Sequence, residues 1–183
     1  HGLTFGPDPS THDRCTLGGM IGNNACGMHS LWAGRTEDNV HALDVLLYDG
    51  TRLDLRYRTL DEMRELAARD DRIGEVHRGL LALREEYADL VHERYPDIPR
   101  RVSGYNLPEL LGADGIHTAR ALVGTEGTCG VVLEATVELL PSPPARSALV
   151  LAYPSIAEAG DQVPEILDSG CIALEGIDEQ LTR

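Results

Sequence analysis

The sequence contains no lysine, and all 16 of its basic residues are arginine. A P-loop of the form G-x-x-x-x-G-K-[ST] is therefore excluded, because its lysine is the group that reaches the nucleotide phosphates. The G-x-G-x-x-G spacing of a Rossmann dinucleotide site is also absent. A nicotinamide site is thus a poor fit to this chain.

Aromatic residues make up only 4% of the chain, so its core must rest on Leu, Val, Ile and Ala. No apolar run approaches the roughly 18 residues that a membrane-spanning helix needs, and no signal-peptide pattern opens the sequence. The net charge of −14 argues against nucleic acid and anionic membranes as partners, since both attract basic proteins. With 183 residues, 42% of them hydrophobic, the chain is long enough for one globular domain, or for one domain and part of another.

Cysteine is scarce, and the four cysteines show no C-x-x-C spacing. We therefore predict no zinc or iron–sulfur site within this chain. Cys15, Cys26, Cys129 and Cys171 are interpreted as reduced thiols of a cytoplasmic protein.

Glycine, in contrast, is concentrated in two stretches. Thr16–Gly27 holds four glycines, and each would cost a core helix about 1 kcal/mol relative to alanine. We predict a loop passing into a short helical turn, whose backbone comes close to a bulky anionic ligand. Gly124–Gly130 has the same character and lies between two apolar runs. The pair indicates one ligand held from two sides, although the second stretch alone is also typical of a tight connection between strands.

The first half of the chain predicts a hairpin followed by two helices. A buried strand over 42–48, an Asp49-Gly50 turn and a return strand over 51–55 form the hairpin. Thr59 and Glu62 have the spacing of a capping box at the start of a helix. Gly74 is predicted to separate this helix from a longer one over about 75–95.

The second half predicts a short helical turn over 108–111, a strand over 118–123 that enters the second glycine stretch, and a long strand over 131–140. The proline-rich segment 141–144 is the best domain boundary in the chain. A strand over 148–153, a helix over about 155–168 and a strand over 171–176 are predicted beyond it. This unit is too small to be independent, so we expect the chain to be a piece cut from a larger protein.

Four segments together resemble a known flavoprotein family: Pro7–Thr11, Thr16–Gly27, Val45–Gly50 and Gly124–Gly130. They are similar to the flavin-binding domain of the vanillyl-alcohol-oxidase and p-cresol-methylhydroxylase superfamily. Within it, the chain looks most like the FAD-linked D-2-hydroxy-acid dehydrogenases, which include D-lactate dehydrogenase, the glycolate oxidase flavin subunit and D-2-hydroxyglutarate dehydrogenase. The segment 99–107 is similar to the large bacterial members that carry an iron–sulfur region. The resemblance covers nearly the whole chain.

The resemblance implies an α+β fold. Residues 1–141 would form the C-terminal lobe of a two-lobed FAD-binding domain, with a mixed or antiparallel sheet flanked by helices. Residues 145–183 would begin an α/β substrate domain. The N-terminal lobe, the catalytic groups and the iron–sulfur cysteines would lie outside this chain. Alone, the chain would then be catalytically inactive and bind FAD weakly.

The same resemblance implies which residues line the cofactor. The expected FAD-binding residues are Pro7, Asp8, Ser10, Thr16, Gly18, Gly19, Gly22, Asn23, Asn24, Gly27, Gly124, Thr125, Glu126, Gly127, Gly130 and Val132. Of these, Pro7, Asp8 and Ser10 are expected near the flavin ring or its linker. Backbone N–H groups would offset the diphosphate charge without a basic residue.

The family further implies hydride transfer from a D-2-hydroxy acid to FAD, with electrons leaving to an acceptor through the iron–sulfur region. The full-length enzyme would be cytoplasmic or peripheral at the inner membrane face, and it could form a homodimer. Two alternatives stay open: another FAD-linked alcohol or sugar oxidase, or a non-catalytic nucleotide-binding module.

Several residues near the glycine stretches have two interpretations each. His12 and His29 would serve as proton carriers near a flavin or simply form local hydrogen bonds. Cys15 stands where some members of the superfamily attach the flavin covalently. Arg101 and Tyr105 would either face the substrate or cover the domain edge.

Overall fold

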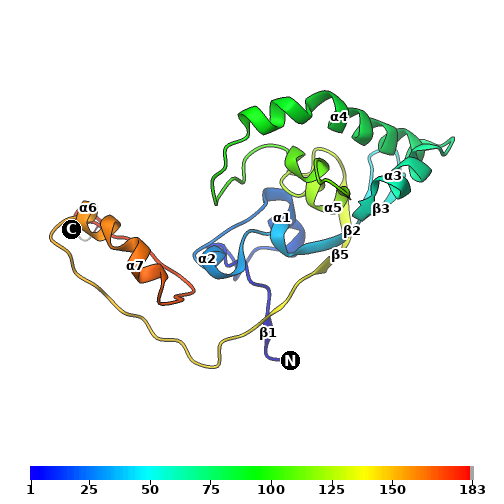
Figure 1. Cartoon of the computed structure of the whole chain (residues 1–183). Helices are drawn as coiled ribbons and strands as arrows, with labels where there is room; N and C mark the ends of the chain where they lie inside the picture. Colours follow the sequence, from blue (N-terminus) through cyan, green and yellow to red (C-terminus); the bar gives the residue numbers. More distant parts are fainter. Residues whose placement is uncertain (182–183) are drawn as a thin grey trace.

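The computed structural model describes residues 1–181 and contains one main antiparallel sheet, with strand order β4-β3-β2-β5 (Figure 1). Its strands are β2 (Val40–Leu46), β3 (Arg52–Thr59), β4 (Gly115–His117) and β5 (Val131–Val137). The predicted α+β class, with an antiparallel sheet flanked by helices, is confirmed.

The β2–β3 hairpin follows the predicted alternation of side chains. Leu43 pairs with Leu55 and Val45 with Leu53, and all four side chains are buried. Gly50, at φ 88°, makes the turn that the sequence predicts. The return strand β3 is longer than predicted, because its last residues pair with β4.

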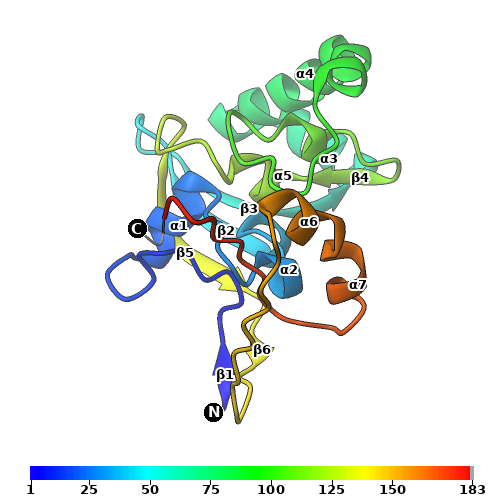
Figure 2. The same cartoon turned by 90° about the vertical axis from the view of Figure 1, so that its left-hand side faces the viewer.

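One face of the sheet carries the core. This face is covered by α4 (Arg72–Arg94), α5 (Thr118–Leu122) and Ile21 of α1 (Leu17–Asn23), while α3 (Leu60–Ala67) contributes Met63 to a second apolar cluster with Leu110 and Ile116 (Figure 2). The buried apolar residues of the core are Ile21, Val40, Leu43, Val45, Leu53, Leu55, Ala119 and Val123. The opposite face carries charged pairs, such as the Arg52 Nε that donates to the Asp44 carboxylate at 2.8 Å. Burying one apolar face is the main stabilising contribution that such a sheet makes.

Capping residues fix where the two long helices begin. The predicted capping box at α3 is confirmed: the Thr59 hydroxyl accepts from the Glu62 N–H, and Glu62 accepts from the Thr59 N–H at 2.8 Å. In α4, the Asp71 carboxylate accepts from the Gly74 N–H at 3.0 Å, so the helix begins at Arg72. The predicted break at Gly74 is wrong. Gly74 lies inside α4, and the two helices are separated at residues 68–71. A larger residue would not fit at position 74, because a Cβ there would meet the Arg69 carbonyl oxygen at 2.1 Å.

The predicted strand over 118–123 is also wrong. The strand in this region is β4, which ends at His117, and the chain then forms α5. The His117 Nδ1 accepts a hydrogen bond from the Arg120 N–H at 3.3 Å and caps the helix. The apolar residues Ala119 and Val123 therefore face the sheet from a helix and not from a strand.

This cap leads to a prediction about pH. Burial, followed by the Arg120 charge, lowers the pKa of His117 from its usual 6.5 to about 4. The unfolded chain thus binds a proton that the folded chain does not, so stability falls as the pH drops from about 6.5 to 4. We expect His117→Asn, which keeps a capping side chain, to flatten this part of the curve of melting temperature against pH.

The matched control is His92→Asn, at an exposed position of α4, which should leave the slope between pH 6.5 and 4 unchanged. If the parent and His117→Asn show the same slope, His117 does not contribute to the loss of stability in acid.

Short elements complete the described chain. They are β1 (Leu3–Thr4), α1 (Leu17–Asn23), α2 (Ser30–Ala33), η1 (Glu37–Asn39), η2 (Leu107–Leu110), β6 (Leu140–Pro141), α6 (Ile156–Asp161) and α7 (Val163–Leu167). β1 pairs with β6 in a separate two-stranded sheet. The predicted turn over 108–111 is confirmed as η2, one residue earlier. No helix among residues 1–181 is both long and apolar enough to cross a membrane.

After β6 the chain runs as an extended linker to α6 and α7 (Figure 1). The two strands predicted at 148–153 and 171–176 are wrong, since both segments are irregular. Leu149 and Val150 are 83% and 91% exposed, so no neighbouring strand within the described chain covers or pairs with them. A run of apolar residues alone does not make a strand without a partner to accept its hydrogen bonds.

Candidate functional site

The first glycine stretch forms helix α1, which is more regular than the predicted helical turn. The Thr16 hydroxyl accepts from the Gly19 N–H at 3.1 Å and caps the helix. Met20 and Ile21 are buried, while Gly18 and Gly19 are exposed. The helix thus presents its apolar side to the core and its glycine side outward, which explains how it accommodates three glycines.

The second glycine stretch packs directly against the end of α1. The Gly124 N–H donates to the Ile21 carbonyl at 2.9 Å, and the Glu126 N–H donates to the Gly22 carbonyl at 2.9 Å. A Cβ on Gly22 would lie 3.8 Å from the Glu126 Cα, which indicates how closely the two backbones approach. Positive φ angles at Gly124, Glu126 and Gly127 make the tight path of this loop possible. The two stretches, far apart in the sequence, therefore lie side by side.

A hollow of about 260 Å³, which we term the first hollow, opens between these two segments. The residues that line it are Thr16, Gly18, Gly19, Ile21, Gly22, Tyr48, Leu122, Thr125, Gly127, Gly130, Val131 and Val132. Eight of the expected FAD-binding residues are in this lining: Thr16, Gly18, Gly19, Gly22, Thr125, Gly127, Gly130 and Val132.

The sequence-based prediction missed Tyr48 in this lining. Its hydroxyl donates to the Gly127 carbonyl and so joins the β2–β3 turn to the second glycine loop. The only sequence signal for Tyr48 was its place just before the Asp49-Gly50 turn. A tyrosine at such a position does not by itself indicate a binding site.

The chemistry of the first hollow fits a group that is both bulky and anionic. A Cβ on Gly18 would meet nothing within 4 Å, so this side of α1 is open. Leu17 and Gly18 stand in the first helical turn, where N–H groups have no acceptor within the helix. No charged side chain is among the lining residues, so these amides and the Thr16 hydroxyl are the polar groups on the α1 side. A diphosphate is satisfied by such donors.

A second hollow, of about 250 Å³, includes Pro7 and Asp8 in its lining, with Met20 of α1. The other lining residues are Thr4, Phe5, His12, His29, Trp32, Pro143 and Arg146. The Asp8 carboxylate is 2.8 Å from the His12 Nδ1 and 3.2 Å from the His29 Nδ1. The structure therefore shows local hydrogen bonding for both histidines, one of the two interpretations that the sequence left open.

Six expected cofactor residues line neither hollow: Ser10, Asn23, Asn24, Gly27, Gly124 and Glu126. Ser10 and Asn23 are exposed, and Asn24 is buried at the end of α1. Gly27 supports the second hollow, because a Cβ there would lie 1.6 Å from the Asp8 carbonyl oxygen.

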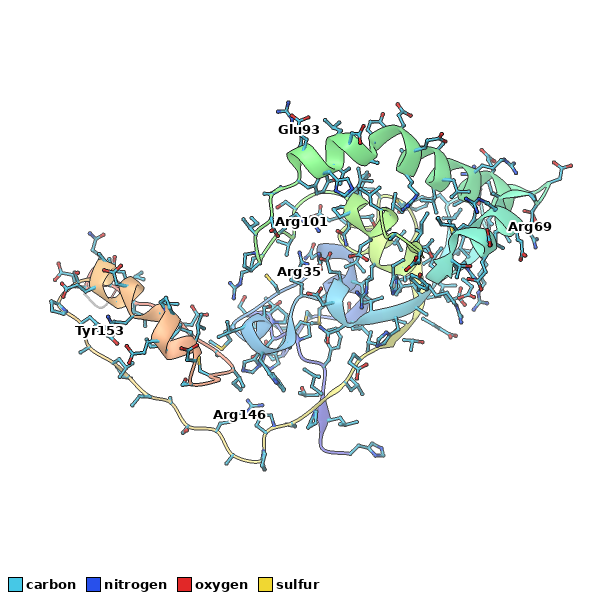
Figure 3. The ribbon with its side chains drawn as sticks, viewed as in Figure 1. Arg35, Arg69, Glu93, Arg101, Arg146 and Tyr153 are labelled. Atoms are coloured by element: carbon cyan, nitrogen blue, oxygen red, sulfur yellow. The ribbon has the colours of Figure 1, made fainter. Side chains whose placement is uncertain are left out.

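Residues 100–106 form a strap across both glycine stretches. The Arg100 guanidinium donates to the Gly27 carbonyl at 2.7 Å, and the Tyr105 hydroxyl lies 2.9 Å from the Thr128 hydroxyl. The Arg101 guanidinium stacks over the Tyr95 ring at 5.3 Å, and the Arg101 carbonyl accepts from Arg35 at 2.7 Å (Figure 3). Within this structure, the strap holds the glycine stretches in place.

The four cysteines are free thiols, and Cys15 is half-buried. Among residues 1–181, no group of three or more His, Cys, Asp or Glu side chains is arranged to hold a metal ion.

Comparison with known proteins shows what this chain is similar to. Residues 1–56 match a family described as FAD binding domain. The chain is 31% identical over 182 residues to D-2-hydroxyglutarate dehydrogenase of Pseudomonas putida, which covers 99% of this chain and 18% of that protein. The matched segment contains the α1 side of the first hollow. The chain is thus similar over nearly its whole length to part of a D-2-hydroxyglutarate dehydrogenase, and its first 56 residues match an FAD binding domain.

Other relatives share this relationship at similar identity. The glycolate oxidase subunit GlcD of Escherichia coli is 28% identical over 172 residues, covering 94% of this chain and 24% of the relative. D-lactate dehydrogenase of Archaeoglobus fulgidus is 26% identical over 166 residues, covering 91% and 26%. The chain thus spans 18% of the D-2-hydroxyglutarate dehydrogenase of P. putida and about a quarter of these two. The resemblance that the sequence motifs indicated is confirmed.

Proposed function

We propose that the full-length protein is an FAD-linked oxidoreductase that oxidises a D-2-hydroxy acid, and that this chain supplies one wall of its FAD site. The observation that carries the proposal is the glycine-lined first hollow, which lies partly within the segment that matches the FAD binding domain family. The sequence similarity to D-2-hydroxyglutarate dehydrogenase and to a glycolate oxidase subunit supports a hydroxy acid as the substrate.

In this proposal, the first hollow receives the diphosphate and the adjoining chain of FAD. Gly18 and Gly19 allow close approach on the α1 side, and Thr16 donates its hydroxyl proton, since its oxygen already accepts from the Gly19 N–H. Thr125 and Gly127 form the opposite wall. Tyr48, hydrogen-bonded to Gly127, fixes the position of that wall.

The other expected residues keep distinct tasks in the proposal. Pro7 and Asp8 face the flavin end from the second hollow, while Asn24, Gly124 and Glu126 fix the backbone that carries the lining residues. Bound FAD would supply the acceptor for the hydride from the α-carbon of the hydroxy acid. This chain binds and orients the cofactor, and it contributes no group that accepts the substrate proton.

A protein of net charge −14 can hold an anionic cofactor in this way because the donors are backbone groups. Amides of a helix terminus offer partial positive charge without a basic side chain.

Four expectations remain predictions: the domain boundary at 141–145, an iron–sulfur region elsewhere in the protein, a homodimer and a cytoplasmic location.

The test is to purify the full-length protein, record its absorbance spectrum, and assay dye reduction with D-2-hydroxyglutarate, D-lactate and glycolate, using the L-enantiomers as controls. We expect a flavin spectrum and turnover with at least one D-2-hydroxy acid.

Two results would contradict the proposal in different ways. A colourless protein that stays colourless after FAD is added would favour a non-catalytic nucleotide-binding module. A flavoprotein that oxidises alcohols or sugars, but none of the hydroxy acids, would keep the cofactor and overturn the substrate class.

A further inference from the structure

Glu37 carries a carboxylate in the interior of the chain, next to neither hollow. Its residue is 1% exposed, although charged side chains are rarely buried unless they are paired. It stands in η1, between α2 and β2. Glu37 is not among the residues for which the family resemblance implied a role.

Four side-chain donors converge on this carboxylate. The Glu37 Oε2 accepts from the Asn24 Nδ2 at 2.6 Å and from the Asn106 Nδ2 at 2.5 Å. The Oε1 forms an ion pair with Arg35 and lies 3.9 Å from the Arg101 Nη2. Figure 3 labels both arginines, with Arg101 on the strap and Arg35 on the segment before η1.

Asn24 connects Glu37 to the first glycine stretch. It ends α1 in the left-handed conformation, at φ 48° and ψ 50°. Its side-chain oxygen accepts from the Glu37 N–H at 3.0 Å, so the two residues bind each other in both directions. A Cβ on Gly124 would lie 3.4 Å from the Asn24 Cβ, so the position of Asn24 also limits that of the second glycine loop.

Asn106 connects Glu37 to the strap. Its side-chain nitrogen also donates to the Arg120 carbonyl at 3.1 Å, and its oxygen accepts from the Arg101 Nη2 at 3.0 Å. The neighbouring Tyr105 hydroxyl lies 2.9 Å from the Thr128 hydroxyl of the second glycine loop. One carboxylate thus joins α1 to the strap that holds the opposite wall of the first hollow.

A side chain that accepts at both of its terminal atoms suits this position. A carboxylate accepts at both oxygens, whereas a glutamine amide would turn one NH₂ group toward the asparagine or the arginine donors. Stability alone does not account for the charge. Burial raises the pKa of the Glu37 carboxyl, with Arg35 acting in the opposite direction. A raised folded-state pKa means that this group stabilises the fold below its unfolded pKa, and that the contribution is lost as the pH rises through the folded value.

We propose that Glu37 is a positioning residue that sets the separation of the two walls of the first hollow by holding Asn24 and Asn106 on one carboxylate. This inference rests on the proposed function, since the hollow is taken to be the FAD site. It adds a residue outside that site to the set on which cofactor affinity depends.

The test compares the full-length protein with Glu37→Gln and Asn106→Ala, and uses Glu93→Gln, an exposed change on α4, as the control. Amide hydrogen exchange is measured on flavin-free protein, and FAD affinity is measured by titration. We expect Glu37→Gln to speed exchange in both 16–24 and 124–130 and to weaken FAD binding at least tenfold. Asn106→Ala should speed exchange in 124–130 alone, because Asn24 still holds Glu37.

Exchange in the β2–β3 hairpin separates positioning from a general loss of stability, since it should match the parent in both variants. Faster exchange throughout the chain, or unchanged exchange in the two loops, would overturn the proposal. If Glu37→Gln does not fold, Asn106→Ala decides alone: faster exchange confined to 124–130 supports the proposal, and unchanged exchange there, or faster exchange throughout the chain, overturns it. If the parent binds no FAD, the proposed function fails, while the exchange measurement still decides whether Glu37 joins the two walls.

Discussion

Replacing Gly27 by alanine is expected to lower the free energy of unfolding by about 3 kcal/mol, the upper part of the range for overpacked sites. The new Cβ would lie 1.6 Å from the Asp8 carbonyl oxygen and 2.8 Å from the Pro9 nitrogen. Both atoms belong to the backbone, so no side-chain rotation relieves the contact. Moving this backbone would displace Asp8 from His12 and His29.

The measurement is thermal and urea-induced unfolding of the full-length protein, followed by its flavin content. Gly79→Ala is the matched control, because that glycine is exposed within α4 and its added Cβ would meet nothing within 4 Å. It should stabilise the helix by about 1 kcal/mol. A Gly27→Ala protein as stable as its parent would mean that the 7–9 and 27 segments do not approach as closely as described.

Replacing Gly19 by valine should have the largest effect on cofactor binding. The added Cβ would meet only the Thr16 hydroxyl oxygen, at 3.3 Å, so the fold should persist. The rest of the side chain would enter the first hollow, where Gly19 is a lining residue. Each charge-assisted hydrogen bond that is lost contributes about 1.5–3 kcal/mol, so losing two should weaken FAD binding at least ~100-fold.

Titration of flavin-stripped protein with FAD measures this effect, with circular dichroism as a check on the fold. Gly79→Val is the control, since it places the same side chain in a helix far from the hollow along the chain. If Gly19→Val retains the flavin content of the parent, Gly19 does not line the cofactor.

The parts of the fold that local rules govern could be predicted from the sequence. The hairpin around Gly50, the capping box at Thr59 and the helix that ends at Arg94 each depend on residues within a few positions of one another. The errors arise where tertiary contacts decide. The segment 118–123 was predicted as a strand because it leads into the second glycine stretch. Residues 118–122 form a helix instead, because Ala, Arg and Leu favour one, His117 caps it and its apolar residues meet the sheet.

The glycines of the candidate site could be predicted from the sequence, but the residues that hold the glycine segments in place could not. Glycine density at 16–27 and 124–130 indicated two loops for one ligand, and the structure brings these segments together at Gly22 and Glu126. Tyr48 and Glu37 left no such signal, because their partners, Gly127 and Asn106, are far away in the sequence. Long-range polar contacts become visible only once the chain is folded.

The central claim is that the first hollow holds the diphosphate part of FAD, and hydrogen exchange of the flavin-stripped full-length protein, with and without FAD, tests it most directly. We predict that FAD slows exchange of the backbone amides in 16–22 and 124–130, the two segments that face each other across the hollow. Binding of FAD that slows exchange only in other parts of the protein, and leaves both segments unchanged, would contradict the claim.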